Sequence, residues 1–103
     1  MPRILVVDDE PDALLAARAA LVGAGHDCVL AADGDRALEL LAAGGFDLVV
    51  IDPAMPLHDG WPVLIAAGAV PVVVVSNAAV AGRLPKPCTA ADLVAAVTAA
   101  LGR

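Results

Sequence analysis

The sequence predicts an α/β fold built on a parallel β-sheet. Short runs rich in β-branched residues alternate with alanine- and leucine-rich segments of helical period, which is the pattern of repeated βαβ units. Two of the runs, residues 48–51 and 72–75, contain only valine, isoleucine and leucine, as strands buried on both faces do. With 103 residues, the chain is long enough for one domain with a single core.

The first half of the chain contains two predicted helices. Pro11 and Asp12 suit the first turn of a helix, because that turn leaves amides unpaired and its dipole favours an acid. Glycines end this helix near residue 24. Asp33-Gly34 forms a turn into a second helix over residues 35–43. The strands predicted around these helices cover residues 3–7, 26–31 and 48–51.

The second half of the chain contains shorter predicted elements. The last helix is expected to begin at Thr89, whose hydroxyl caps it while Asp92 reaches back to the cap, and to run to about residue 101. No internal repeat or linker divides the chain. The elements before the last helix are a short apolar helix over residues 61–67, a strand over residues 72–75 and a very short strand over residues 83–85.

Composition and charge argue against several classes of function. The net charge is −6 and the six lysines and arginines are scattered, so the chain lacks the clustered positive charge that nucleic-acid binding requires. Although 60% of the residues are hydrophobic, Asp, Gly or Pro interrupts every apolar stretch before about 18 residues, the length of a membrane-spanning helix. Because no secretory signal precedes the first strand, we expect a cytoplasmic location, with Cys28 and Cys88 as reduced thiols.

Three carboxylates stand at the ends of two predicted strands. Asp8 and Asp9 follow the apolar run at residues 4–7, and Asp52 follows the run at residues 48–51. The carboxyl ends of strands form the ligand crevice of an open α/β sheet, so we expect these acids to converge on one site. Convergent carboxylates favour a hard divalent cation. For Asp8 and Asp9 alone, a solvated turn before the next helix is the simpler interpretation, and the matching position of Asp52 argues against it.

Further polar residues follow the later strands, and the whole series resembles a known family. The series consists of Asp8-Asp9, the stretch from Asp52 to Gly60, Ser76 after the valine strand, and Lys86-Pro87. It resembles the response-regulator receiver domain of two-component signalling, over the whole chain and in order. The resemblance implies a single receiver domain over residues 1–103. It also implies a flavodoxin-like, doubly wound sheet of five parallel strands in the order 2-1-3-4-5.

The resemblance assigns a chemical role to the acids. It implies that Asp52 is the phosphoacceptor, which attacks the phosphoryl group of a phosphohistidine on a histidine kinase or phosphotransfer protein. It also implies Mg²⁺ as the cofactor. Asp9 and Asp52 are expected to bind the ion directly, Asp8 through a bound water, and Ala54 through its backbone carbonyl.

Four other residues near this site have two interpretations each. The resemblance implies that Ser76 and Lys86 contact phosphoryl oxygens, and that Lys86 pairs with Asp52 before transfer. The alternative for Ser76 is a strand-end hydroxyl hydrogen-bonded to its own backbone, and the alternative for Lys86 is an ordinary surface cation. For Glu10 we favour an interaction with the helix dipole over a place at the metal. For His58 we favour a solvent-facing loop position over a role as catalytic base.

The chain departs from the family pattern between Ser76 and Lys86. Only nine residues separate the two, which at about 1.5 Å of rise per residue leaves no room for the helix that the family normally has there. We expect that helix to be missing or vestigial and the helix at residues 61–67 to be shortened. The side of strands four and five left uncovered is then expected to bind a partner or a second copy of the chain. Arg83 replaces the family's switch aromatic, so an aromatic-rotamer output is not expected.

Two other functions compete with that of a phosphoacceptor. A degenerate receiver would act as a phosphorylation-independent adaptor, which the lost helix favours and the retained acids, serine and lysine oppose. A phosphatase of the haloacid dehalogenase type would need an aspartate two residues after the nucleophile, where the chain has Ala54. We therefore predict a stand-alone receiver that is not an enzyme and that signals through contacts with an effector protein.

Overall fold

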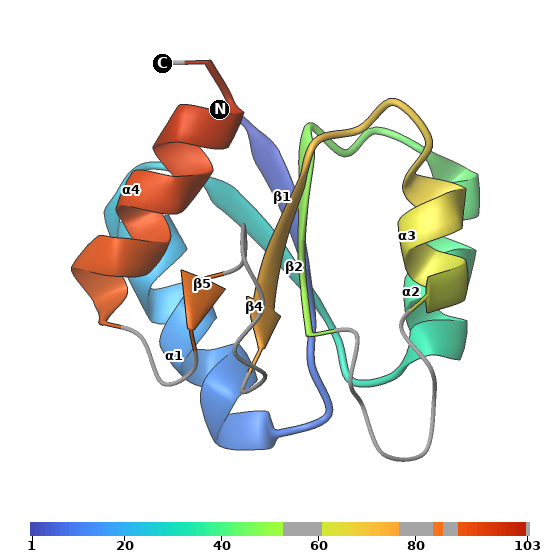
Figure 1. Cartoon of the computed structure of the whole chain (residues 1–103), viewed down its shortest axis with the longest axis horizontal. Coiled ribbons are helices and arrows are strands. Elements are labelled where there is room, and N and C mark those ends of the chain that lie inside the picture. The colour runs from blue at the N-terminus through green and yellow to red at the C-terminus, as the bar shows by residue number, and fades with distance from the viewer. Residues whose placement is uncertain (53–60, 77–83, 86–88, 103) are drawn as a thin grey trace.

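The computed structural model describes residues 1–52, 61–76, 84–85 and 89–102. Within these ranges the chain forms a five-stranded parallel sheet of order β2-β1-β3-β4-β5 with helices on both faces (Figure 1). The predicted α/β flavodoxin-like fold and its strand order are thus confirmed. The strands are β1 (Arg3–Val7), β2 (Asp27–Ala31), β3 (Leu48–Ile51), β4 (Val72–Ser76) and β5 (Leu84–Pro85). The helices are α1 (Pro11–Gly23), α2 (Gly34–Ala43), α3 (Trp61–Ala67) and α4 (Ala90–Ala100).

Element boundaries differ from the prediction by one residue at several ends. Helix α2 begins at Gly34, because the Asp33 side chain accepts a hydrogen bond from the Arg36 amide at 2.8 Å and caps the helix there. The capping box of α4 is confirmed, with the Asp92 amide donating to the Thr89 hydroxyl at 3.1 Å and the Thr89 amide donating to Asp92 Oδ2 at 3.3 Å. Helix α1 ends before residue 24 and α4 ends before residue 101. Strand β2 begins after residue 26, and β4 extends to residue 76.

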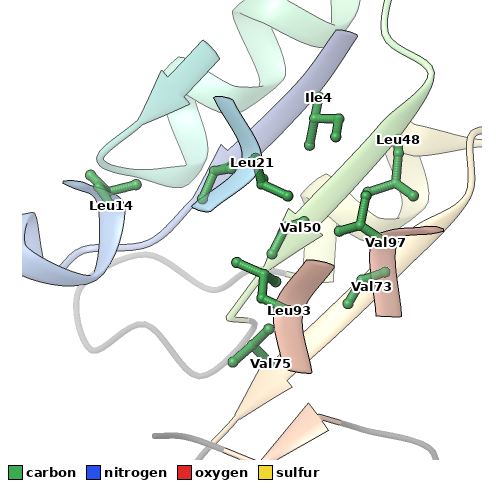
Figure 2. Close-up of a cluster of buried hydrophobic side chains, with 10 residues drawn as sticks. Ile4, Leu14, Leu21, Leu48, Val50, Val73, Val75, Leu93 and Val97 are labelled. Carbon is green, nitrogen blue, oxygen red and sulfur yellow. The ribbon is translucent and has the colours of Figure 1, made fainter. Parts of the chain in front are cut away.

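Each face of the sheet carries two helices and its own core. Helices α1 and α4 pack on one face, and α2 and α3 pack on the other (Figure 1). Neighbouring strand residues point to opposite faces, so Ile4 and Val6 join the α1/α4 core while Leu5 and Val7 join the α2/α3 core. Among the described residues, no helix has the length and apolarity needed to cross a membrane. The α1/α4 core consists of Ile4, Val6, Leu14, Leu21, Leu48, Val50, Val73, Val75, Leu93 and Val97 (Figure 2).

Strand β4 is covered unequally on its two faces. Val73 and Val75 are buried on the α1/α4 side, whereas Val72 and Val74 are only half-buried on the α2/α3 side. The valine run predicted burial on both faces, and this expectation was wrong for the second face. The nearest described helix on that side, α3, has seven residues and packs against α2. The expected loss of a helix between β4 and β5 concerns residues 77–83, including Arg83, which lie outside the described ranges.

The α1/α4 core predicts a sharp contrast between two leucines of one helix. Leu21 is 0% exposed and Leu15 is 57% exposed, and both lie on α1. We expect Leu21→Ala to lower the free energy of unfolding by about 2–5 kcal/mol, because it leaves a cavity in the core. Leu15→Ala is the matched control, with an expected change within about 0.5 kcal/mol. Urea denaturation measures both values, and equal losses would contradict the packing described for α1.

Cys28 on β2 is a free, half-buried thiol, as predicted; Cys88 lies outside the described residues. Burial raises the pKa of Cys28, and the nearby charge of Arg18 only partly opposes this effect. Because the thiolate is the form that reacts, alkylation of folded Cys88→Ser protein by iodoacetamide should rise with pH at a higher midpoint than alkylation of the urea-unfolded chain. The neutral thiol stabilises the fold below the unfolded pKa, and this contribution is lost as the pH rises through the folded pKa. Coincident midpoints would contradict the prediction.

Candidate functional site

The carboxyl ends of β1, β2 and β3 meet at one edge of the sheet. Val7 of β1 is paired with Ile51 of β3, and the Asp52 amide donates to the Val7 carbonyl at 3.2 Å. On its other side Val7 is paired with Ala31 of β2, and the Asp8 amide donates to the Ala31 carbonyl at 3.2 Å. The hydrogen-bond ladder therefore continues one residue beyond each strand. It holds the backbones of Asp8 and Asp52 next to each other, as predicted from the sequence.

A cluster of carboxylates occupies this edge. Asp8, Asp9 and Glu10 each offer a carboxylate oxygen, and these three oxygens lie within 4.8 Å of one another. The Glu10 amide donates to Asp8 Oδ1 at 3.0 Å, which orients the Asp8 carboxylate. Asp8 is 6% exposed and Asp52 is 8% exposed, so two carboxylates are buried at the end of the sheet. Buried anions are costly unless hydrogen bonds or cations offset them, and the hydrogen bond from the Glu10 amide is one such interaction at Asp8.

Glu10 has both of the positions that the sequence left open. It is the N-cap residue of α1, followed by Pro11 at the start of the helix and Asp12 in the first turn. Its side chain makes no capping hydrogen bond to the helix. The positive end of the helix dipole lies at this point and stabilises negative charge. Glu10 thus interacts with the dipole and also belongs to the acidic cluster, so its position is consistent with either role.

The remaining predicted site residues are described only in part. Ser76 is the last residue of β4 and is paired with Pro85 of β5. Its backbone therefore lies at the carboxyl end of β4, the strand next to β3. Lys86, Ala54 and His58 lie outside the described residues. The structure therefore brings the Asp8 and Asp9 carboxylates together with that of Glu10, and it places the backbones of Asp52 and Ser76 at the same edge of the sheet, with the Asp52 carboxylate outside that group.

The donor set at this edge fits a hard divalent cation. Every ligand that the cluster offers is a carboxylate oxygen, which is the donor type that Mg²⁺ prefers. Magnesium keeps several waters of its own, so two or three carboxylates are enough. The residues present are therefore suited to holding Mg²⁺.

A cleft beside the acids was not predicted from the sequence. It has a volume of about 490 Å³, and its described lining includes Asp8 and Asp52 together with residues at the starts of α1 and α4. Asp12 and Thr89, which were predicted only as helix-start residues, line it. The only sequence signal for such a cleft is the spacing of alanines along α1, and that pattern is as common in well-packed helices.

Known proteins are similar to this chain in sequence and in fold. The sequence profile described as response regulator receiver domain matches residues 4–98. The transcriptional regulatory protein PrrA of Mycobacterium tuberculosis is 38% identical over 118 aligned residues, which cover 99% of this chain and 51% of PrrA. This chain thus spans about half the length of that curated relative.

Two solved structures agree with the match in sequence. The receiver domain from the hybrid histidine kinase CckA is 38% identical with a TM-score of 0.81, and the match covers 96% of this chain and 98% of that one. A response regulator receiver protein from Sinorhizobium medicae is 33% identical with a TM-score of 0.87, covering 98% of this chain and 94% of that one. Both the sequence and the backbone are thus similar over nearly the full chain.

Proposed function

The chain belongs to the response-regulator receiver family of two-component signalling, and from this premise we propose that it accepts a phosphoryl group on Asp52. The observation that carries the proposal is the position of Asp52, which directly follows β3 and is held beside the buried Asp8 by the strand ladder. The proposed donor is a phosphohistidine of a histidine kinase or a phosphotransfer protein. The strand ladder holds the Asp52 backbone in place before the donor arrives, which supports the proposal because the proposed nucleophile then loses less orientational freedom in the reaction.

The proposed reaction is a direct phosphoryl transfer. A carboxylate oxygen of Asp52 forms a bond to phosphorus while the bond between phosphorus and the donor imidazole nitrogen breaks, and the imidazole leaves with the electron pair. The product is an aspartyl phosphate on Asp52. In this proposal the Ser76 hydroxyl donates to one phosphoryl oxygen and the Lys86 ammonium pairs with another. Both groups offset charge on the phosphoryl oxygens during transfer.

Magnesium is the proposed cofactor of this transfer. When bound, Mg²⁺ neutralises charge on the phosphoryl oxygens and on the carboxylates around them. Asp9 and Asp52 would hold it directly, Asp8 through a water and Ala54 through its carbonyl. The orientation of the Asp8 carboxylate by the Glu10 amide supports this set, because a fixed carboxylate binds a metal-bound water with little loss of entropy.

The proposed output is a contact with another protein in the cytoplasm rather than catalytic turnover. We propose that the chain works as a receiver, which changes its own phosphorylation state and binds an effector. The half-buried Val72 and Val74 supply apolar surface on the α2/α3 side of β4, which supports an effector or a second copy of the chain binding there. The net charge of −6 argues against direct binding to nucleic acid.

The phosphoacceptor is tested with beryllofluoride, a mimic of the aspartyl phosphate, added with Mg²⁺ to isotope-labelled protein. We expect the amide resonances of Asp8 and Asp52 to shift in the wild type and to stay unchanged in Asp52→Asn. Asp35→Asn, on the opposite-face helix α2, is the matched control and should respond as the wild type does. A folded wild type without any shift would favour the phosphorylation-independent adaptor.

The metal site is tested by equilibrium unfolding with and without Mg²⁺. An ion that binds only the folded state raises the free energy of unfolding by about 2.7 kcal/mol at a hundredfold excess over its Kd. We expect this gain in the wild type and in Asp35→Asn, and most of it to be lost in Asp9→Asn. Asp9 is exposed, so its substitution tests the ion without disturbing the core. An equal gain in Asp9→Asn would argue against Asp9 as a ligand.

A further inference from the structure

Strand β2 forms one edge of the sheet, with β1 on one side and no strand of the described chain on the other. Its residues 28–31 are Cys-Val-Leu-Ala, and their register with β1 is unbroken. They include no charged side chain, proline or bulge, three of the features by which edge strands avoid pairing with other chains. Cys28, Val29 and Leu30 are each half-buried, so apolar surface remains on both faces of this edge. These residues therefore do not oppose a further strand.

The backbone groups that β2 directs away from β1 belong to Cys28 and Leu30. The Asp27 amide donates to β1 at 2.9 Å, and the Ala31 carbonyl accepts from the residue after β1 at 3.2 Å. The N–H and C=O of a strand residue point to one side and those of the next residue to the other, so Asp27, Val29 and Ala31 direct both groups to β1. Cys28 and Leu30 therefore present theirs at the edge, where none of the described residues hydrogen-bonds them.

These outward groups are self-complementary across a two-fold axis. If a second copy of β2 lies antiparallel with the two Val29 residues opposite each other, each Cys28 faces Leu30 of the other copy. Such a pair exchanges both of its N–H to C=O hydrogen bonds, so every outward group of the two residues finds a partner. The opposing side chains are apolar on both faces, with Cys28 against Leu30 on one and Val29 against Val29 on the other.

The same register keeps the acids of the two strands apart. Asp27 is the only charged residue of β2, and it lies opposite Ala31 of the second copy. The two Asp27 residues are therefore offset by about 13 Å along the strands, which exceeds the screening length of about 8 Å at physiological ionic strength. An antiparallel second copy thus adds little charge repulsion at this edge, although each chain has a net charge of −6.

We propose that two copies of the chain associate through their β2 edges into one continuous sheet, with the two-fold axis between the Val29 residues. This surface is separate from the apolar side of β4, and the proposal does not rest on phosphoryl transfer to Asp52. Two short strands bury less than roughly 1,200 Å², the lower end for stable interfaces. We therefore expect a weak dimer, with a Kd on the order of 0.1–1 mM.

The association is tested by amide NMR and diffusion measurements over protein concentrations from about 0.05 to about 2 mM, which bracket the expected Kd. We expect saturable shifts at Cys28, Val29 and Leu30 as diffusion slows. Val29→Lys should abolish both effects, because it sets two ammonium groups opposite each other at the axis. Val22→Lys, the same change at a 52% exposed site on α1, is the control and should associate as the wild type does. A monomer at every concentration would leave the edge to another protein and overturn the proposal, as would unchanged association of folded Val29→Lys.

A cysteine at the axis tests the register without a charged substitution. In protein carrying Cys28→Ser and Cys88→Ser, Val29→Cys places two thiols at a non-hydrogen-bonded pair, whose Cα atoms lie about 4.5 Å apart and permit a disulfide. Leu30→Cys is the control, because its two thiols occupy diagonal positions about 7–8 Å apart, where a disulfide needs backbone movement. We expect oxidised glutathione to link Val29→Cys into dimers several-fold faster than Leu30→Cys. Equal rates, or a faster Leu30→Cys reaction, would overturn the proposal, whereas a missing response to beryllofluoride would concern only Asp52.

Discussion

The parallel pairing of β1 with β3 is the constraint on which the site depends. Val7 and Ile51 are partners in this register and both side chains belong to the α2/α3 core. Side chains alternate along a strand, so the residues that follow, Asp8 and Asp52, point to the α1/α4 side. Both line the cleft beside the starts of those helices, as the alternation requires. A slip of one residue in β3 would turn its apolar side chains to the wrong faces and separate the two acids, so the cores that fix the register also assemble the site.

The strand ends and helix starts were predictable because they depend on local chemistry. Thr89 and Asp92 form the expected capping box, since each satisfies an amide that the other leaves unpaired. At the second helix, Asp33 and Asp35 both suit a helix start, and only the hydrogen bond from the Arg36 amide shows that Asp33 is the cap. The acids of the site were predictable for the same reason, because they directly follow apolar strands whose parallel ends must coincide.

What the sequence could not provide depends on distances between elements. A valine run indicates that β4 is apolar but does not indicate what covers it. The half-burial of Val72 and Val74 depends on the position of the short helix α3, which packs against α2. The position of Glu10 in the acidic cluster depends on the orientation of α1 relative to β1, since a small rotation of the helix would move the Glu10 carboxylate away. The cleft beside α1 likewise depends on the separation of α1 from α4, which alanine spacing alone does not determine.

Helix α1 connects the acidic edge with the cleft, and this has a thermodynamic consequence. Its first turn contributes Asp12 to the cleft, and its N-cap residue Glu10 orients Asp8 at the edge of the sheet. Asp8 and Asp52 line the cleft as well as the proposed metal site, so a change of charge at Asp52 alters the potential that a cation in the cleft experiences. On the proposed mechanism, phosphorylation adds negative charge at this point and the bound Mg²⁺ offsets part of it. Coupling between binding sites is reciprocal, so whatever change phosphorylation makes in the affinity for Mg²⁺, the ion makes by the same factor in the equilibrium for phosphorylation.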